Sequence, residues 1–148
     1  MSTQLILGSL ETVSLPELGV EGVLAKVDTG AFSGALHCTD IRAERHGKEH
    51  TLYFTPLGKE SLATKTSNFK EIIVRSANGH ESVRYVIPAV VELHGKSYET
   101  LIGLSDRTVM MRDMLLGRRF LLENNAIVDV SLTKDIDTEA ERIEEDDE

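Results

Sequence analysis

Apolar and polar positions alternate with a period of two along much of this chain, which is the pattern of β-strands with one buried face. Turn residues separate the apolar runs at short, regular intervals, so the sequence predicts strands rather than long helices. The predicted strands span residues 4–9, 12–15, 22–27, 35–45, 51–54, 71–75, 82–87, 89–93, 98–104 and 126–130. One short helix is predicted over residues 118–124, and the polar residues 58–68 are expected to form a loop.

Two hairpin turns stand out between these strands. Asn78-Gly79 lies between β-rich segments, and Asn-Gly is a strong hairpin signal because a type I′ turn needs positive φ at both central positions. His94-Gly95 marks the second hairpin, and Pro88 is expected to interrupt the ladder between the two. Strands at this spacing with one short C-terminal helix predict an all-β fold, a small closed barrel.

The composition changes this picture little, because it is that of one globular domain. The chain has 148 residues, of which 41% are hydrophobic and 28% charged. No apolar run approaches the ~20 residues of a membrane span, and residues 1–4 lack the basic region of a secretory signal. The single Cys38 leaves no disulfide framework. We expect a cytoplasmic protein without membrane association.

The net charge of −9 is concentrated at the C-terminal end. Residues 134–148 hold nine acidic and two basic residues, a net of −7, which leaves −2 for residues 1–133. The body therefore lacks the basic face of a nucleic-acid-binding protein. We expect a domain over residues 1–133 followed by a solvated, disordered acidic tail; a tail that mimics or repels an acidic substrate is the alternative.

The candidate chemistry lies where a predicted strand ends in Asp28-Thr29-Gly30-Ala31. Far downstream, Leu115-Leu116-Gly117 precedes the predicted helix. A strand that delivers Asp-Thr-Gly and a later Leu-Leu-Gly before a helix are the layout of a pepsin-like active site. Hydrolysis by that route needs two carboxylates, and the chain carries one copy of the motif, so the sequence predicts a homodimer.

Each residue of the motif has an expected role. Two Asp28 carboxylates held close together cannot both be ionised, so the pair is expected to share one proton. One carboxylate would take a proton from the attacking water while the other binds the carbonyl oxygen of the peptide. Thr29 would hold the loop through its hydroxyl, and Gly30 permits close backbone approach. Ala31 supplies no hydroxyl to the carboxylates, which favours a working pH nearer neutral.

Asp28-Thr29-Gly30-Ala31 together with Leu115-Leu116-Gly117-Arg118 resembles the retropepsins, which are homodimeric aspartic proteases. A closer resemblance covers most of residues 5–133 and includes residues 25–31, Ala35-Leu36-His37 and Ser105-Asp106-Arg107. It is to the bacterial and archaeal family commonly labelled "ATP-dependent zinc protease". Members are often associated with ATP-grasp ligases that add glutamate to protein termini. The resemblance therefore implies a retropepsin-like fold and a peptide or protein substrate, with glutamate-modified protein termini as one candidate.

Further site residues follow from the resemblance alone. It implies that Leu115, Leu116 and Gly117 brace the catalytic loop from behind. It also implies that Asn78-Gly79 forms the tip of a flap over the peptide, and that Ala31, Phe32 and Ser33 line the substrate cleft. Retropepsins commonly carry an acid where this chain has Phe32, and that acid pairs with the Arg after Leu-Leu-Gly. Arg118 therefore needs another partner, for which Asp106 is the candidate.

Other interpretations remain open. Asp106 is either a second functional carboxylate or a turn residue that accepts hydrogen bonds. The closer family carries a basic residue and Thr-Ser in place of Phe32-Ser33-Gly34, so an inactive dimeric peptide-binding module is an alternative to a protease. A zinc site is a third possibility, with candidates His37, Cys38, Asp40, His46 and His50. The sequence has no His-Glu-x-x-His, no Cys-x-x-Cys and no phosphate-binding Gly-rich loop, so we expect no metal or other cofactor.

Overall fold

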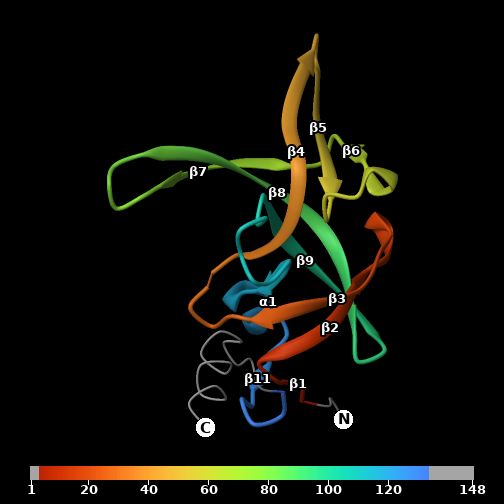
Figure 1. Ribbon diagram of the computed structural model, residues 1–148, viewed down its shortest axis with the longest axis vertical. Coiled ribbons are helices and arrows are strands. Elements are labelled where there is room, and N and C mark those ends of the chain that lie inside the picture. The colour runs from red at the N-terminus through yellow and green to blue at the C-terminus, as the bar shows by residue number, and fades with distance from the viewer. Residues whose placement is uncertain (1–3, 134–148) are drawn as a thin grey trace, which may run out of the picture.

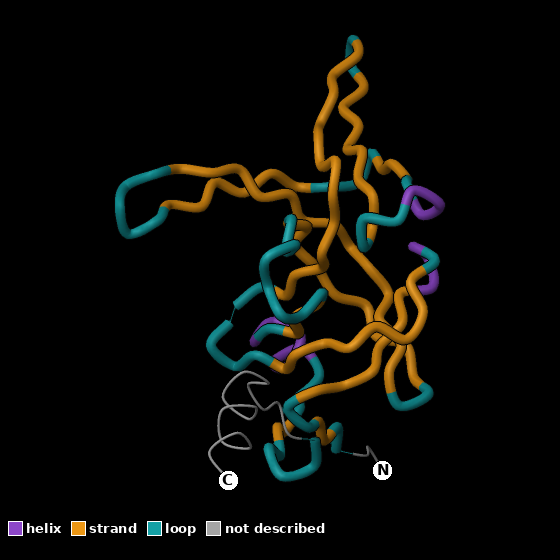
Figure 2. The backbone as a smooth tube through the Cα atoms, viewed as in Figure 1, coloured by secondary structure: helices purple, strands orange, loops and turns teal. Residues whose placement is uncertain are grey.

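The computed structural model describes residues 4–133, and the tail predicted for residues 134–148 lies outside the described residues. Strands make up most of the chain, and helical structure is confined to short segments (Figures 1 and 2). The strands are β1 (Ile6–Leu7), β2 (Leu10–Leu15), β3 (Val20–Val27), β4 (Gly34–His46), β5 (Glu49–Pro56), β6 (Thr64–Thr66), β7 (Lys70–Arg75), β8 (Glu81–Leu93), β9 (Lys96–Ser105), β10 (Met114–Leu116) and β11 (Ile127–Val128). The helical segments are η1 (Pro16–Leu18), η2 (Glu60–Leu62) and α1 (Arg118–Glu123).

Six strands close into a barrel in the order β10-β3-β2-β8-β9-β4, and β4 returns to β10. Two of the contacts are parallel, β3 with β10 and β4 with β9, while the others are antiparallel. The short strand β10 therefore closes the ring by pairing with both β3 and β4. The predicted all-β class and closed barrel with one short C-terminal helix are confirmed.

Alternation along the strands builds the core. In β3, Val20, Val23, Ala25 and Val27 are buried while most of the residues between them are exposed. The core is aliphatic, in keeping with a chain that has no Trp and few aromatic residues. Phe120 of α1 joins it and makes an edge-on ring contact with Tyr98 of β9. Over residues 4–133, no helix has the length and apolarity needed to cross a bilayer.

Two long hairpins extend away from the barrel, one made of β4 and β5 and the other of β7 and β8 (Figure 1). The predicted pairing of residues 71–75 with 82–87 is confirmed, as is that of 89–93 with 98–104. His94 and Gly95 both have positive φ, as a type I′ turn requires.

The predicted type I′ turn at Asn78-Gly79 is wrong. Gly79 alone of the three residues in this loop has positive φ, and its N–H donates to Ser76 O at 3.0 Å. The N–H of Ser76 also donates to His80 O at 2.8 Å, so the turn is a three-residue loop with Gly in the left-handed position. One Gly was enough for this turn, and Asn78 therefore keeps an ordinary φ.

Pro88 does not interrupt the ladder, contrary to the prediction. β8 runs through it without a register shift, and Pro88 faces Leu101 of β9. On its other side β8 pairs with β7 only up to Val86 and with β2 only at Glu92, so Pro88 lies on an open edge where a missing N–H costs no ladder bond. The loop predicted over residues 58–68 was also incomplete, because it contains η2 and β6.

Candidate active site

Asp28 follows directly on the last residue of β3, at the start of a loop that ends where β4 begins. Its backbone N–H donates to Leu116 O at 2.9 Å, which ties the loop to β10. The Gly30 N–H donates to the Asp28 carboxylate oxygen Oδ1 at 2.8 Å, and the Ala31 N–H donates to Asp28 O at 2.6 Å. The Asp28 carboxylate is therefore partly buried and oriented by the backbone of its own turn.

Gly30 lies so close to this carboxylate that an added Cβ would be 3.1 Å from Asp28 Oδ1. Thr29 and Gly30 are both exposed at the surface of the described chain. The half-buried Asp28 carboxylate is therefore held by a backbone N–H of its own loop, and the neighbouring residues of that loop are accessible to solvent.

Two glycines let the chain cross itself behind the loop. A Cβ on Gly117 would lie 2.8 Å from Ala31 O and from Ser33 C and O. A Cβ on Gly34 would lie 2.7 Å from Leu115 O. Leu116 is buried at 2% exposure beneath the same crossing, and Leu115 is half-buried. The structure therefore brings Leu115, Leu116 and Gly117 together with residues 28–34.

Arg118 contacts the Asp28 loop directly, and its predicted pairing with Asp106 is wrong. The guanidinium Nη1 donates to Thr29 O at 2.9 Å and to Gly30 O at 3.1 Å, while the backbone N–H donates to Ala31 O at 2.7 Å. Backbone carbonyls replace the acid that retropepsins place after the Ala. Since carbonyl groups carry no signature in a sequence, this partner could not be found from residue types.

Asp106 serves a turn instead. Its carboxylate accepts hydrogen bonds from the Thr108 hydroxyl and, at 3.0 Å, from the Thr108 N–H. These hydrogen bonds lower the pKa of Asp106, and His37, whose Nδ1 lies 3.8 Å from Oδ1, adds a smaller effect in the same direction. This geometry is that of an Asx turn, the structural alternative considered for Asp106.

The Arg118→Met variant should lose stability because it removes both side-chain hydrogen bonds to the loop while keeping an aliphatic stem. Hydrogen bonds from charged groups contribute about 1.5–3 kcal/mol, and because Arg118 is exposed the expected loss falls below that range, at about 1–1.5 kcal/mol. Urea unfolding would measure it. Arg119→Met is the matched control, since the Arg119 side chain covers the Phe32 ring at 4.9 Å. An equal loss in both variants would contradict the role assigned to Arg118.

The remaining predicted cleft residues lie in two places. Phe32 is 51% exposed, and its carbonyl accepts the Arg119 N–H at 2.9 Å, while Ser33 is half-buried beside it. Asn78 and Gly79 are exposed at the tip of the β7–β8 hairpin, away from the barrel (Figure 1). Within residues 4–133, no hydrogen bond or ion pair joins this tip to residues 28–33.

Sequence reasoning missed the role of His37, which it considered only as a metal ligand. His37 is buried, its N–H donates to Asp113 O at 2.7 Å, and its Nδ1 accepts the Arg107 N–H at 2.8 Å. It therefore ties the start of β4 to the segment between β9 and β10. The partners are about seventy residues away in the chain, and no local pattern could have indicated them.

The five zinc candidates do not gather into one site. Within residues 4–133, no three His, Cys, Asp or Glu side chains lie close enough together to hold a metal ion. Cys38 is fully buried, and burial raises the pKa of its thiol to about 12, which disfavours the thiolate that binds zinc. His46 and His50 instead lie beside Glu44 and Glu71, respectively.

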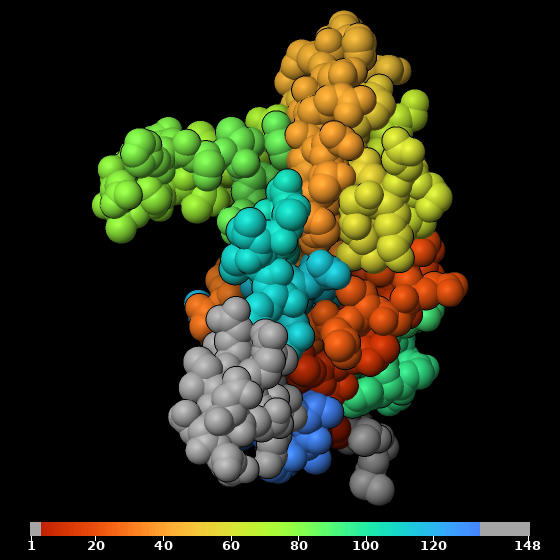
Figure 3. Space-filling view, viewed as in Figure 1, coloured from red at the N-terminus to blue at the C-terminus, as the bar shows by residue number. Residues whose placement is uncertain are grey.

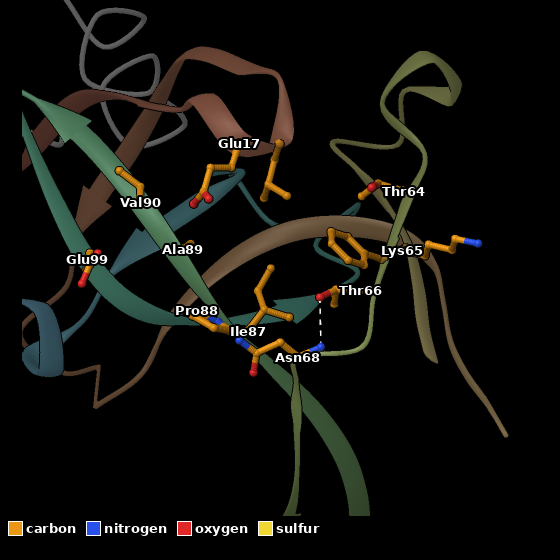
Figure 4. A pocket seen from close by; sticks show the side chains of 12 residues that line it. Glu17, Thr64, Lys65, Thr66, Asn68, Ile87, Pro88, Ala89, Val90 and Glu99 are labelled. Atoms are coloured by element: carbon orange, nitrogen blue, oxygen red, sulfur yellow. Dashed lines mark hydrogen bonds between the residues drawn. The ribbon is translucent and has the colours of Figure 1, made fainter. Parts of the chain in front are cut away.

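The chain also has a cavity of about 470 Å³ on a different part of its surface (Figure 4). It lies among η1, β6 and the open edge of β8, and no residue of the 28–33 loop lines it.

The sequence matches the family model described as "RimB-like: Retropepsin-like aspartic endopeptidase RimB" over residues 6–139. The chain belongs to this family. The match covers the Asp28 loop, the barrel and the Leu115-Leu116-Gly117 crossing, and it confirms the retropepsin-like resemblance seen in the sequence.

Curated relatives of this RimB-like chain carry a different name. It is 34% identical over 131 residues to a protein named "Probable alpha-L-glutamate ligase" from Shewanella pealeana, and 30% identical over 132 residues to one of the same name from Desulfotalea psychrophila. These matches cover 85% and 86% of this chain but 28% of each relative. The chain thus spans little more than a quarter of the length of these relatives.

Among solved structures, the RimB-like chain is similar to a Legionella pneumophila protein whose function is given as unknown. The TM-score is 0.66 at 25% sequence identity, and the match covers 88% of this chain and 97% of the other. The same barrel therefore recurs in a protein of similar extent.

Proposed function

We propose that this protein is an aspartic-type peptidase that hydrolyses peptide or isopeptide bonds as a homodimer with two Asp28 carboxylates. The observation that carries the proposal is the Asp28 carboxylate itself, which receives the Gly30 N–H and stands on a loop fixed by β10 and Arg118. Membership of a retropepsin-like aspartic endopeptidase family supports it.

The proposed reaction needs no group beyond two carboxylates and water. The ionised carboxylate takes a proton from water as the water oxygen bonds to the carbonyl carbon of the peptide. The protonated carboxylic acid of the other subunit gives its proton to the carbonyl oxygen, which forms a tetrahedral intermediate. The C–N bond then breaks, a proton passes to the leaving nitrogen, and the pair is left with one shared proton again.

Several apolar side chains of the described chain are exposed, and they support association of two chains. Phe32 of the catalytic loop is 51% exposed, and Met110 and Met111 of the β9–β10 segment are 55% and 57% exposed. Ile6 and Ile127, which are paired across β1 and β11, are 44% and 52% exposed. A second chain that covered these side chains would remove their apolar surface from water. Met114, by contrast, belongs to the core.

Glutamate-extended protein termini are the proposed substrates, and the cytoplasm is the proposed location. The support is that two of the matched relatives, named as glutamate ligases, contain a region like this chain within a longer polypeptide. A hydrolase joined to an enzyme that adds glutamate would act on the product of that enzyme.

The test is hydrolysis of a synthetic peptide that ends in a chain of glutamates, followed by mass spectrometry. We expect glutamate-containing fragments, a rate per protomer that rises with protein concentration as dimers form, and no effect of a chelator. Binding of the peptide without turnover would indicate the peptide-binding module and overturn the peptidase. Stoichiometric zinc with loss of activity in chelator would indicate a metalloprotein, and a monomer at high concentration would overturn the dimer.

A further inference from the structure

Arg84 lies at the base of the β7–β8 hairpin, opposite Ile72. Its stem passes over Gly103 of β9, where an added Cβ would meet Arg84 Cδ at 3.3 Å. The same position is 3.2 Å from Gly34 O, at the end of the catalytic loop. A side chain at position 103 would press on the Arg84 stem, so this stem lies against β9 beside the start of β4.

Arg107 comes from the segment that follows β9. Its backbone N–H donates to His37 Nδ1, and its side-chain Nε donates to Arg112 O at 2.9 Å. These two hydrogen bonds fix the backbone and the orientation of the guanidinium. Within residues 4–133, no hydrogen bond uses the terminal Nη1 and Nη2 of Arg107, which are the groups that could contact a ligand.

The charges of Arg84 and Asp28 both act on the guanidinium of Arg107. Burial lowers the pKa of Arg107, the charge of Arg84 lowers it further, and the negative charges of Asp113 and Asp28 oppose the shift. Arg107 stays protonated near neutral pH because an arginine pKa begins far above that range. Two cations are therefore held near each other and near the catalytic carboxylate.

Neither arginine has an acidic partner within ion-pairing distance in the described part of the chain. Two other arginines do have acidic partners, since Arg42 lies 3.2 Å from Glu44 and Arg75 lies 2.7 Å from Glu81. The like charges of Arg84 and Arg107 repel each other, and an anion bound between them would reduce that repulsion.

A hollow lies between the hairpin and the end of β9, below the projecting arm in Figure 3. It has a volume of about 290 Å³, and its lining includes Arg84, Ser82 and Ser105. Asp106 also lines it, with its carboxylate engaged by Thr108. This space is at the small end of ligand pockets and is of the size to admit one side chain rather than a whole ligand.

We infer that Arg84 and Arg107 form a subsite that binds the carboxylate of an acidic substrate side chain next to the bond cleaved at Asp28. The inference rests on the proposed function. Arginine suits this task because its planar guanidinium donates two parallel hydrogen bonds to one carboxylate. The subsite discriminates glutamate from glutamine, because the amide leaves the two positive charges uncompensated.

The test uses two peptides that differ only by Glu or Gln at the position flanking the cleaved bond. For the unchanged protein we expect kcat/KM to favour the Glu peptide by about 10–100-fold, as for a charge-assisted contact of about 1.5–3 kcal/mol. The combined Arg84→Met and Arg107→Met variant should bring that ratio close to one. Arg42→Met, which also removes an exposed arginine, is the control and should keep the ratio.

Binding separates this inference from the proposed peptidase activity. Fluorescence anisotropy with the Asp28→Asn variant measures the affinity for both labelled peptides without turnover. A Glu preference that depends on both arginines, in a protein that hydrolyses neither peptide, would support the subsite and overturn the peptidase. Hydrolysis with equal kcat/KM for the two peptides, or a Glu preference that survives the double variant with its fold intact, would overturn the subsite.

Discussion

Peptide hydrolysis by the Asp28→Asn variant should fall by about 10³-fold or more, while the fold and the subunit association are retained. Asn keeps a side-chain oxygen that can accept the Gly30 N–H, which donates to Asp28 at 2.8 Å, so the loop has no reason to rearrange. It has no carboxylate to take a proton from water, and a positioned base contributes about 10²–10⁴-fold. In a homodimer the substitution would remove the carboxylate from both subunits. The initial rate of hydrolysis of the glutamate peptide measures the loss of activity.

Asp129→Asn is the matched control for that variant. Asp129 also accepts a backbone N–H and a hydroxyl, both from Ser131, but it lies near β11, after the helix, and not in the catalytic loop. Its rate should match that of the unchanged protein. Undiminished hydrolysis by Asp28→Asn would end the proposal that this carboxylate is the base.

The Gly117→Ala variant should lose about 1–3 kcal/mol of unfolding free energy and most of its activity. The added methyl group would stand 2.8 Å from backbone atoms of Ala31 and Ser33, and backbone atoms cannot turn aside as a flexible side chain can. The φ of Gly117 is −95°, which alanine adopts freely, so the whole effect would be steric. Urea unfolding gives the free energy, and hydrolysis assays report the displaced loop.

Gly47→Ala is the control in which the backbone conformation, and not a steric clash, causes the loss of stability. Gly47 lies in the turn of the β4–β5 hairpin with no atom near its Cβ position, but its φ is +64°. The variant should lose about 1 kcal/mol of unfolding free energy, because alanine is strained in the left-handed conformation. Its rate of hydrolysis should be unchanged. A Gly117→Ala protein as stable and active as the unchanged chain would show that the crossing is not tight.

Features set by neighbouring residues could be predicted from the sequence. The hairpin around Asn78-Gly79 and the one at His94-Gly95 follow from alternation and turn residues, and both pairings are present. The exact turn at Asn78 was missed because one left-handed glycine satisfies a three-residue loop as well as a two-residue one. Pro88 was misjudged because an open strand edge is a property of the sheet and not of the residue.

The candidate site, too, could be predicted from the sequence only in part. The strand that ends at Asp28 and the distant Leu115-Leu116-Gly117 could be recognised as a motif, and they lie together in the structure. The contacts of Arg118 with loop carbonyls and of Arg107 with His37 join segments 70 to 89 residues apart. Such contacts depend on how the barrel closes, and no spacing in the chain encodes them.

The three residues of β10 also bear on the order in which the protein acquires its structure. On one side β10 pairs with residues 25–27 of β3, and on the other it pairs with Ala35 and Leu36 of β4. Some eighty residues of chain separate β10 from these partners. Pairings of such long sequence separation form late and slow the folding of a domain. During synthesis, therefore, the segment around Asp28 lacks its contacts with β10 until residue 116 has left the ribosome.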